Sequence, residues 1–289
     1  MPRSDAVIEP RPAAYWQVAP LAAVLAGFVV FPLGAIAVAS FWDYENYRLV
    51  PTFVLRNYAE LFASHVTYVT YLHTLLLAAL AWACTLLIGF TVAYFLAFHV
   101  RTTIWRTVLF LLCTIPFWTS NIIRMISWIP FLGRHGIVNS VLLATGLIGQ
   151  PLEFLLFSDF AVVLAFVHLY TLFMVVPIFN SMMRIDRSLI EAAADGGATP
   201  WRVVREIVVP LSKPGMAIGS VFVVSLVMGD FVTVRLMGGG KSAAVGLMLA
   251  NSLALLQYPQ AAAGAVVLLV VVLGMVGTIL TLVDVQKEL

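Results

Sequence analysis

Six long apolar stretches dominate the sequence and decide what the chain can fold into. They run over Val18–Trp42, Tyr68–Phe98, Thr107–Phe131, Phe160–Met183, Pro214–Met237 and Ala261–Val283. A helix needs about 20 predominantly apolar residues to cross roughly 30 Å of hydrocarbon, and each stretch reaches that length. The stretches are continuously apolar and lack the alternation of a membrane barrel strand. The sequence therefore predicts an all-α polytopic membrane protein with six transmembrane helices.

The composition fits this assignment. Apolar residues make up 62% of the 289 positions and charged residues 10%, which excludes a water-soluble domain. The first stretch exceeds the core of a signal peptide, about 7–15 residues, so we expect it to remain as a span. We therefore expect one transmembrane domain at residues 18–283, a cytoplasmic arm at 1–17 and a cytoplasmic tail at 284–289.

The basic residues predict the orientation of the chain. Ten of the sixteen lysines and arginines precede the first stretch, follow the sixth, or lie in the loops after the second and the fourth. They are Arg3, Arg11, Arg101, Arg106, Arg184, Arg187, Arg202, Arg205, Lys213 and Lys287. By the positive-inside rule this side faces the cytoplasm. Both termini and the polar loop at 184–213 are therefore expected to be cytoplasmic.

That loop contains the longest polar interruption in the sequence. Starting at Ser188 it reads SLIEAAADGGATPWRVVREIVVPLSKPG. Its first four residues, ending in Glu191, have the spacing of a capping box, which predicts a helix start at the serine. The Gly196-Gly197 pair stops that helix, and Thr199-Pro200 begins another, because proline loses no hydrogen bond at the first helical position. We expect the second helix to end at Pro210.

The same loop resembles a known family. Its residues match the "EAA" loop in the membrane subunits of binding-protein-dependent ABC importers, with Val209 in place of the usual leucine. The resemblance implies a type I importer permease in a bacterial inner membrane, whose loop docks on an ATPase. The residues implied in docking and coupling are Glu191, Ala192, Ala193, Gly197, Ile207 and Pro210.

Within that family the sequence is most similar to the spermidine/putrescine-type permeases. The similarity rests on Ile115–Thr119 followed by Ile123-Arg124, on Leu236–Lys241, and on Asn57-Tyr58. It implies a second homologous permease chain, two ATP-binding subunits that hold ATP and Mg, an extracytoplasmic solute-binding protein, and a polyamine or related substrate. We expect contact with the lipid bilayer and with a small-molecule substrate, and none with nucleic acid.

One position departs from the relatives. Many of them have a proline and an acidic or neutral residue where this chain has Val234 and Arg235. An added cation beside the pathway disfavours a polycation. An amino-acid derivative, an opine-like compound or a small organic anion therefore stays open as the substrate.

Charged groups inside the apolar stretches are the candidates for a translocation pathway, since a charge at mid-membrane costs about 2.5–3.5 kcal/mol unless it faces protein or water. The candidates, with the aromatic residues beside them, are Phe117, Trp118, Arg124, Asp230, Phe231 and Arg235. Internal pairing of Arg124 with Asp230 is an equally good interpretation. His168 is better explained as a structural histidine, and Arg235 can extend to the interface.

The sequence shows no arrangement of residues typical of a catalytic or nucleotide-binding site. Gly240-Lys241-Ser242 resembles the end of a phosphate-binding loop, but Arg235 stands where that loop needs a glycine. The five histidines are scattered without metal-ligand spacing. Cys84 and Cys113 lie in apolar stretches and are expected to be small hydrophobic side chains. We therefore expect no catalytic residue, metal or cofactor in this chain. An ion-coupled secondary transporter is the rival class, although no internal repeat supports it.

Overall fold

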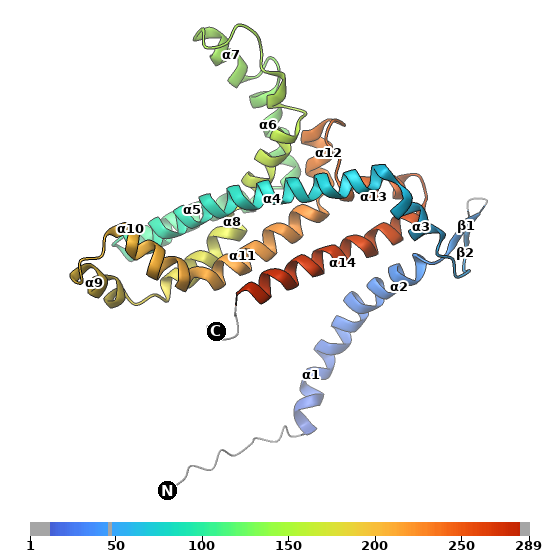
Figure 1. The fold of residues 1–289 in the computed structure, drawn as a ribbon, viewed down its shortest axis with the longest axis horizontal. Helices are drawn as coiled ribbons and strands as arrows, with labels where there is room; N and C mark the ends of the chain where they lie inside the picture. The colour runs from blue at the N-terminus through green and yellow to red at the C-terminus, as the bar shows by residue number, and fades with distance from the viewer. Residues whose placement is uncertain (1–11, 46–47, 284–289) are drawn as a thin grey trace.

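The computed structural model describes residues 12–45 and 48–283, and the fold is almost entirely helical (Figure 1). The helices are α1 (Pro12–Leu25), α2 (Phe31–Ala39), α3 (Arg56–Ala63), α4 (His65–Tyr94), α5 (Thr103–Thr114), α6 (Asn121–Leu132), α7 (Ile137–Ala144), α8 (Asp159–Met183), α9 (Arg187–Asp195), α10 (Pro200–Val203), α11 (Val209–Gly229), α12 (Val232–Gly238), α13 (Val245–Ala254) and α14 (Tyr258–Leu282). Strands β1 (Asp43–Glu45) and β2 (Arg48–Val50) form an antiparallel hairpin.

Five helical segments of the described residues are long and apolar enough to cross a membrane. They are Ala19–Ala39, His65–His99, Asp159–Met183, Pro200–Gly229 and Tyr258–Leu282. The pair Thr103–Trp118 and Asn121–Ala144, bent by 91°, makes a sixth if it counts as one span. Six predicted spans are compatible with this result. The predicted arm and tail fall largely outside the described residues, although α1 begins at Pro12 inside the expected arm.

The third and fifth predicted spans are each interrupted in the structure. The chain turns between α5 and α6, because Pro116 tightens it into a 3₁₀ turn and Thr119 then adopts an extended conformation. Pro130, by contrast, lies inside α6. The fifth span was predicted to reach Met237, but α11 ends at Gly229 and Asp230 is extended. The carboxylate of Asp230 accepts a hydrogen bond from the Thr233 amide, 2.9 Å away, and so supports the start of α12 instead.

A π-helical turn precedes each of two prolines in the spans. Ala26–Val30 leads into Pro32, and Val204–Val208 leads into Pro210. A π turn shifts the hydrogen-bond register by one residue, which relieves the lost amide donor and the clash that proline brings to a helix. The prediction that the second loop helix ends at Pro210 was therefore wrong. Helix continues from Pro200 through Gly229.

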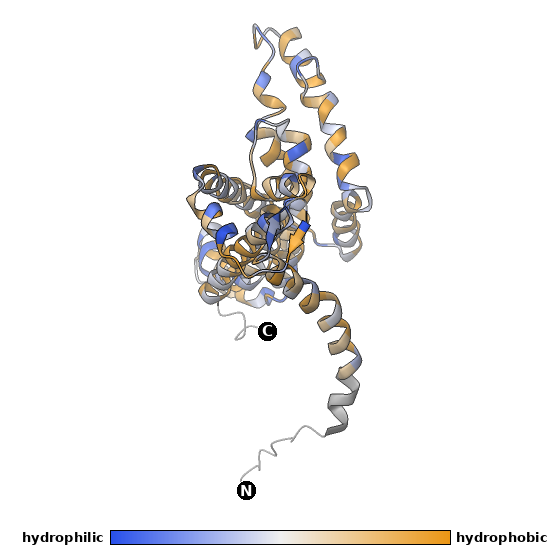
Figure 2. Ribbon diagram, turned by 90° about the vertical axis from the view of Figure 1, so that its right-hand side faces the viewer, coloured by the Kyte–Doolittle hydropathy of each residue, from blue (hydrophilic) through white to orange (hydrophobic). Residues whose placement is uncertain are grey.

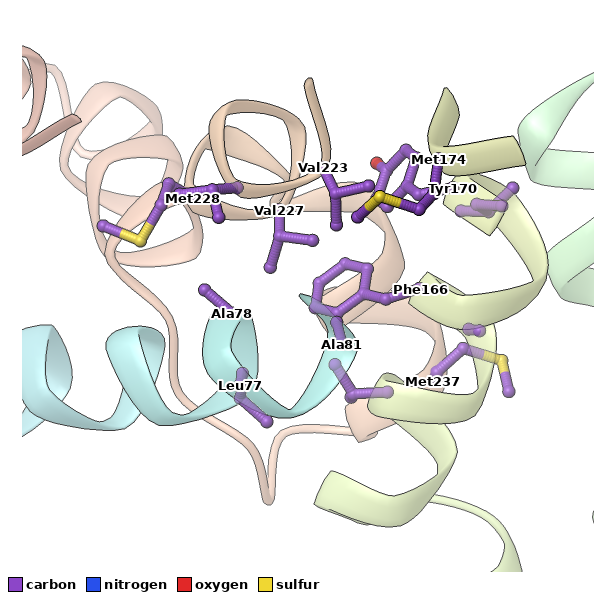
Figure 3. Packing of buried hydrophobic residues seen from close by; sticks show 14 of the residues in the cluster. Leu77, Ala78, Ala81, Phe166, Tyr170, Met174, Val223, Val227, Met228 and Met237 are labelled. Atoms are coloured by element: carbon purple, nitrogen blue, oxygen red, sulfur yellow. The ribbon is translucent and has the colours of Figure 1, made fainter. Parts of the chain in front are cut away.

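The core of the molecule is formed by α4, α8 and α11, which lie side by side (Figures 1 and 3). Its buried side chains include Leu77, Ala78, Ala81, Phe166, Tyr170, Met174, Val223, Val227 and Met228. α14 packs along the bundle and also contacts α2, whereas α1 and α2 diverge from it (Figure 1). Apolar residues cover most of these helices, as expected for surfaces that face lipid (Figure 2).

Glycines allow the three core helices to approach closely. A Cβ atom on Gly215 of α11 would overlap the carbonyl oxygen of Pro177 and lie 2.9 Å from Cα of Ile178, both on α8. Met174 of α8 fills the space between Gly89 of α4 and Gly219 of α11. Gly215 and Gly219 form a small-xxx-small pair, and these contacts show the close helix approach that such a pair allows.

The Asn57-Tyr58 pair has a structural role at the opposite end of the bundle from α9. The Asn57 side-chain amide is buried and donates hydrogen bonds to the carbonyl oxygens of Ser40 and Trp42, each 2.9 Å away. The hydroxyl groups of Tyr58 and Ser40 lie 2.7 Å apart. These bonds join the end of α2 to α3.

We expect Gly215→Ala to destabilise the fold by about 1–3 kcal/mol, because the added methyl group meets backbone atoms that cannot move freely. The matched control is Gly274→Ala on α14, where the space around the glycine is open. The control should change stability by about 1 kcal/mol or less. Chemical unfolding of both variants in detergent measures the difference, and equal effects would contradict this contact.

Candidate functional site

The polar loop begins with a capped helix. Asp186, in an extended conformation, is the N-cap of α9, and its Oδ1 accepts a hydrogen bond from the Ser188 amide 2.9 Å away. This bond lowers the pKa of Asp186. The predicted capping box was wrong, because the aspartate two residues earlier provides the cap and Ser188 lies inside the helix. Glu191 is exposed in the middle of α9.

The glycine elbow and the proline restart are confirmed. Gly197 has a φ of +82°, and its amide donates to the Ala194 carbonyl while the amide of Ala198 donates to that of Ala193, each over 2.9 Å. This pair of bonds ends α9 in a left-handed turn that favours glycine. Thr199 then caps α10, its Oγ1 accepting from the Arg202 amide over 3.4 Å.

The six predicted docking residues divide into two groups. Glu191, Ala192 and Gly197 are exposed on α9 and the elbow. Ala193 and Ile207 pack against the buried core, and Pro210 is half-buried. The structure therefore presents a small-residue surface on α9 and joins it through the elbow to the helix that becomes α11.

A polar cluster lies where α11 ends. Oδ2 of Asp230 accepts hydrogen bonds from the Tyr170 hydroxyl, 2.7 Å away, and from the Thr233 hydroxyl, 2.6 Å away. Arg124 is only 8% exposed; its Nη2 donates to the side-chain oxygen of Asn121, and its guanidinium lies 5.9 Å from the Phe117 ring. Among the described residues, no ion pair joins Arg124 to Asp230. The polar bonds of Asp230 come from α8 and α12 instead.

The other predicted pathway residues are exposed. Arg235 is exposed, donates to Asn251 over 3.1 Å and lies 5.9 Å from the Phe231 ring. Trp118 is 82% exposed. Nδ1 of His168 accepts a hydrogen bond from the Trp128 indole 2.9 Å away, which agrees with the structural interpretation of this histidine.

Sequence reasoning missed Tyr170. In an apolar helix a tyrosine reads as one more packing residue. The available signal was physical, because the hydroxyl of a buried tyrosine needs a hydrogen-bond partner. The partner of Tyr170 is Asp230, and it could not be identified without knowing how α8 and α11 pack.

A cavity of about 890 Å³ lies between α8 and α11 and reaches the start of α9, but none of the polar cluster's residues lines it. It extends along α8 and α11, from Phe117 in the 3₁₀ turn after α5 to the start of α9. Its lining residues are Phe117, Leu172, Phe173, Val176, Pro177, Asn180, Ser181, Arg184, Ile185, Asp186, Leu189, Leu211, Pro214, Ile218 and Phe222. The walls are apolar in the middle of the bundle and become polar beside α9.

Comparison with known proteins identifies the family. Residues 15–285 match the family described as "Binding-protein-dependent transport system inner membrane component", and the chain belongs to it. The spermidine/putrescine transport system permease protein PotB of Salmonella typhimurium (strain SL1344) is 33% identical over 246 residues, which cover 84% of each protein. PotB of Escherichia coli (strain K12) is 32% identical over 246 residues, covering 84% of this chain and 88% of that protein.

A solved structure has the same fold. The crystal structure of a bacterial ABC transporter involved in the import of the acidic polysaccharide alginate matches with a TM-score of 0.74 at 19% identity, covering 93% of this chain and 94% of that chain. The chain is therefore a membrane-spanning permease subunit of a type I ABC importer of the bacterial inner membrane. Such a subunit works with a solute-binding protein and ATPase partners. The family excludes the rival interpretation as a secondary transporter.

We expect Asp186→Ala to increase amide hydrogen exchange in the first turn of α9 several-fold, because an amide loses its acceptor. Since the folded pKa of Asp186 is lowered, its contribution is present above the ordinary aspartate pKa and is lost as the pH falls through the folded value. Asp195→Ala, at the other end of α9, is the matched control and should leave that turn unchanged. Mass spectrometry of the exchanged peptides measures both, and unchanged exchange in Asp186→Ala would contradict the cap.

Proposed function

We propose that this chain forms half of a pathway for a polyamine or a related small organic solute. The other half comes from a second, homologous permease, and two ATP-binding subunits attach on the side of α9. ATP and its Mg²⁺ bind to those subunits, and this chain makes no covalent bond. Both termini and the loop at 184–213 face the cytoplasm, in agreement with the distribution of basic residues.

Asp230 supports the choice of a cationic solute. Its carboxylate lies at the end of α11 among Tyr170 and Thr233. It is partly accessible, and a negative group inside an apolar bundle attracts an amine. The two permeases with 32–33% identity carry spermidine and putrescine in their names. Phe117, Trp118 and Phe231 are the aromatic residues of the proposed pathway, since their faces can hold an ammonium group.

A second candidate substrate is an anionic or zwitterionic solute. Arg235 is exposed one turn beyond Phe231, and buried Arg124 has an Nε without a hydrogen-bond partner among the described residues. Either guanidinium could bind a carboxylate. The two candidates predict opposite effects of charge removal.

We expect Asp230→Asn to lower solute uptake at least about tenfold, which corresponds to 1.4 kcal/mol, if the solute is a polyamine. Arg235→Gln should then leave uptake unchanged or raise it. An anionic solute reverses the pattern. The solute is first identified by comparing how strongly the loaded solute-binding protein stimulates the ATPase with polyamines, amino-acid derivatives and small anions. Uptake of that solute by the reconstituted complex is then measured for each variant.

The proposed coupling depends on the small surface formed by α9 and the elbow. When ATP closes the ATPase pair, α9 moves with it, and the continuous helix from Pro200 to Gly229 carries the displacement to Asp230. The transition is a rigid-body rocking of the helices that gives alternating access. Glu191 and Ala192 would contact the ATPase, while Ile207 and Pro210 hold the loop to the bundle.

We expect Gly197→Asp to leave the chain in the membrane but to abolish co-purification of the ATPase, because a charged side chain enters the docking surface. Gly146→Asp is the matched control, since Gly146 also has a positive φ, of +71°, and open space around it. It should retain the ATPase. Affinity purification followed by immunoblotting compares the two, and normal retention by Gly197→Asp would overturn the docking assignment.

A further inference from the structure

The α12–α13 loop, residues 239–244, is fastened to the core by one histidine. α13 and the start of α4 lie at the end of the bundle opposite α9 (Figure 1). Nδ1 of His73, on α4, lies 2.7 Å from the carbonyl oxygen of Ala243 in this loop. Nε2 of the same ring lies 3.0 Å from Oδ2 of Asp159, the first residue of α8. A single imidazole therefore joins the loop to two helices of the core.

Both contacts of His73 require an N–H group on the ring. Carbonyl and carboxylate oxygens only accept hydrogen bonds, and a neutral imidazole has one N–H to donate. A carboxyl group is a much stronger acid than an imidazolium, so the proton between Nε2 and Oδ2 belongs to the ring. In the neutral ring, one nitrogen would turn its lone pair towards an oxygen. The arrangement is therefore complete only when His73 is an imidazolium.

Two further charged groups lie beside Asp159. Lys241 and Glu153 line the same cavity of about 320 Å³. Glu153 lies 3.5 Å from Arg134, and among the described residues no ion pair joins Lys241 to Asp159. Neither group takes the place of His73 as the partner of this aspartate.

The helices that pack against α4 at this end were searched for other titratable groups. In α3, Arg56 and Glu60 lie 3.5 Å from each other. The ten residues of α13 include no titratable side chain. Of the groups that surround the contact, only His73 changes its charge between about pH 5 and 8.

Other contacts hold the ends of the α12–α13 loop whatever the charge of the ring. The amide of Val245, at the start of α13, donates to Oγ1 of Thr74, 2.9 Å away. At the other end of the loop, Gly239 has a φ of +54° and lies against the Phe157 ring, which a Cβ atom would overlap. Loss of the His73 contacts would therefore loosen the middle of the loop and leave its ends attached.

We propose that His73 is a pH-sensitive latch for the α12–α13 loop. As an imidazolium it holds the loop to α4 and α8, and as a neutral imidazole it keeps only one of its two bonds. The stabilisation is present at acidic pH and is lost as the pH rises through the range in which the ring loses its proton. Because α12 carries Thr233 and Arg235, the latch also controls how firmly that helix is held. The inference goes beyond the proposed function and does not depend on the identity of the solute.

Hydrogen exchange followed by mass spectrometry tests the latch in the complete importer complex in nanodiscs. Exchange is measured at about pH 5.5 and about pH 8.5, on the two sides of the titration of histidine, and each rate is divided by the intrinsic rate at that pH. We expect the protection of amides 240–246 to fall at least about fivefold at the higher pH, because a hydrogen bond to a charged group is lost. Amides in the middle of α8 should keep their protection and serve as the internal reference.

Two substitutions separate the latch from other causes of a pH response. His73→Phe removes both bonds, so the loop should have low protection at both pH values. Asp159→Asn should instead keep protection high at both, because an amide accepts from an imidazolium and donates to a neutral imidazole. His65→Phe is the matched control, since His65 is exposed at the first position of the same helix, and it should respond as the unaltered chain does.

Three results would overturn the latch. They are a pH response that persists in His73→Phe, the lack of a response in the unaltered chain, and low loop protection in Asp159→Asn. None of these measurements uses a solute. Failure of the latch is therefore distinguishable from failure of the proposed function, which uptake by Asp230→Asn tests.

Discussion

The close contact between α8 and α11 is the interaction on which the rest of the structure depends. Lipid is as apolar as leucine, so helices in a membrane associate through dispersion contacts and hydrogen bonds instead of a hydrophobic driving force. Here Gly215 lies against the backbone at Pro177, and Met174 fills the space between Gly89 and Gly219. Because α4, α8 and α11 share these contacts, they form one rigid unit. The polar cluster, the cavity and the loop are all attached to it.

A continuous helix connects that unit to the docking surface on α9. The π turn before Pro210 lets one helix run from Pro200, just after the elbow at Gly197, to Gly229, just before Asp230. The sequence had instead predicted that this helix ends at Pro210. A stiff helix of this kind displaces its far end when its near end moves. The proposed coupling uses this property, since the docking surface lies at the beginning of the helix and the charged group at its end.

The sequence was informative where a single physical requirement dominates. Long apolar runs must be helical in lipid, so the helical character of the spans was predictable, although the end of the fifth at Gly229 was not. The glycine elbow and the start of α10 at Pro200 were also predictable. Local structure was harder to predict where two physical requirements compete. Asp186 and Ser188 both can cap a helix, and only the chain geometry shows that the aspartate does so. The effect of Pro210 depends on the shift in hydrogen-bond register at the preceding π turn, and no residue type in the sequence predicts that shift.

Predicting the site was harder again, because its members are brought together by packing. Arg124 and Asp230 were recognised as charges in the membrane, but their partners come from other helices, namely Tyr170 on α8 and Thr233 on α12 for the aspartate. The aromatic character of Phe173 and Phe222 did not distinguish them from packing residues. Their position in the lining of the cavity does, and it depends on how α8 and α11 pack.

Photo-crosslinking tests most directly whether α9 is the surface that receives the ATPase. A photoreactive residue replaces Ala192, which is exposed on α9, in the purified complex, and a second complex carries it at Val141 on α7. We expect irradiation to join the chain to the ATPase from position 192 and not from position 141. Absence of a crosslink from position 192 in a complex that hydrolyses ATP, or an equal crosslink from position 141, would contradict the central claim.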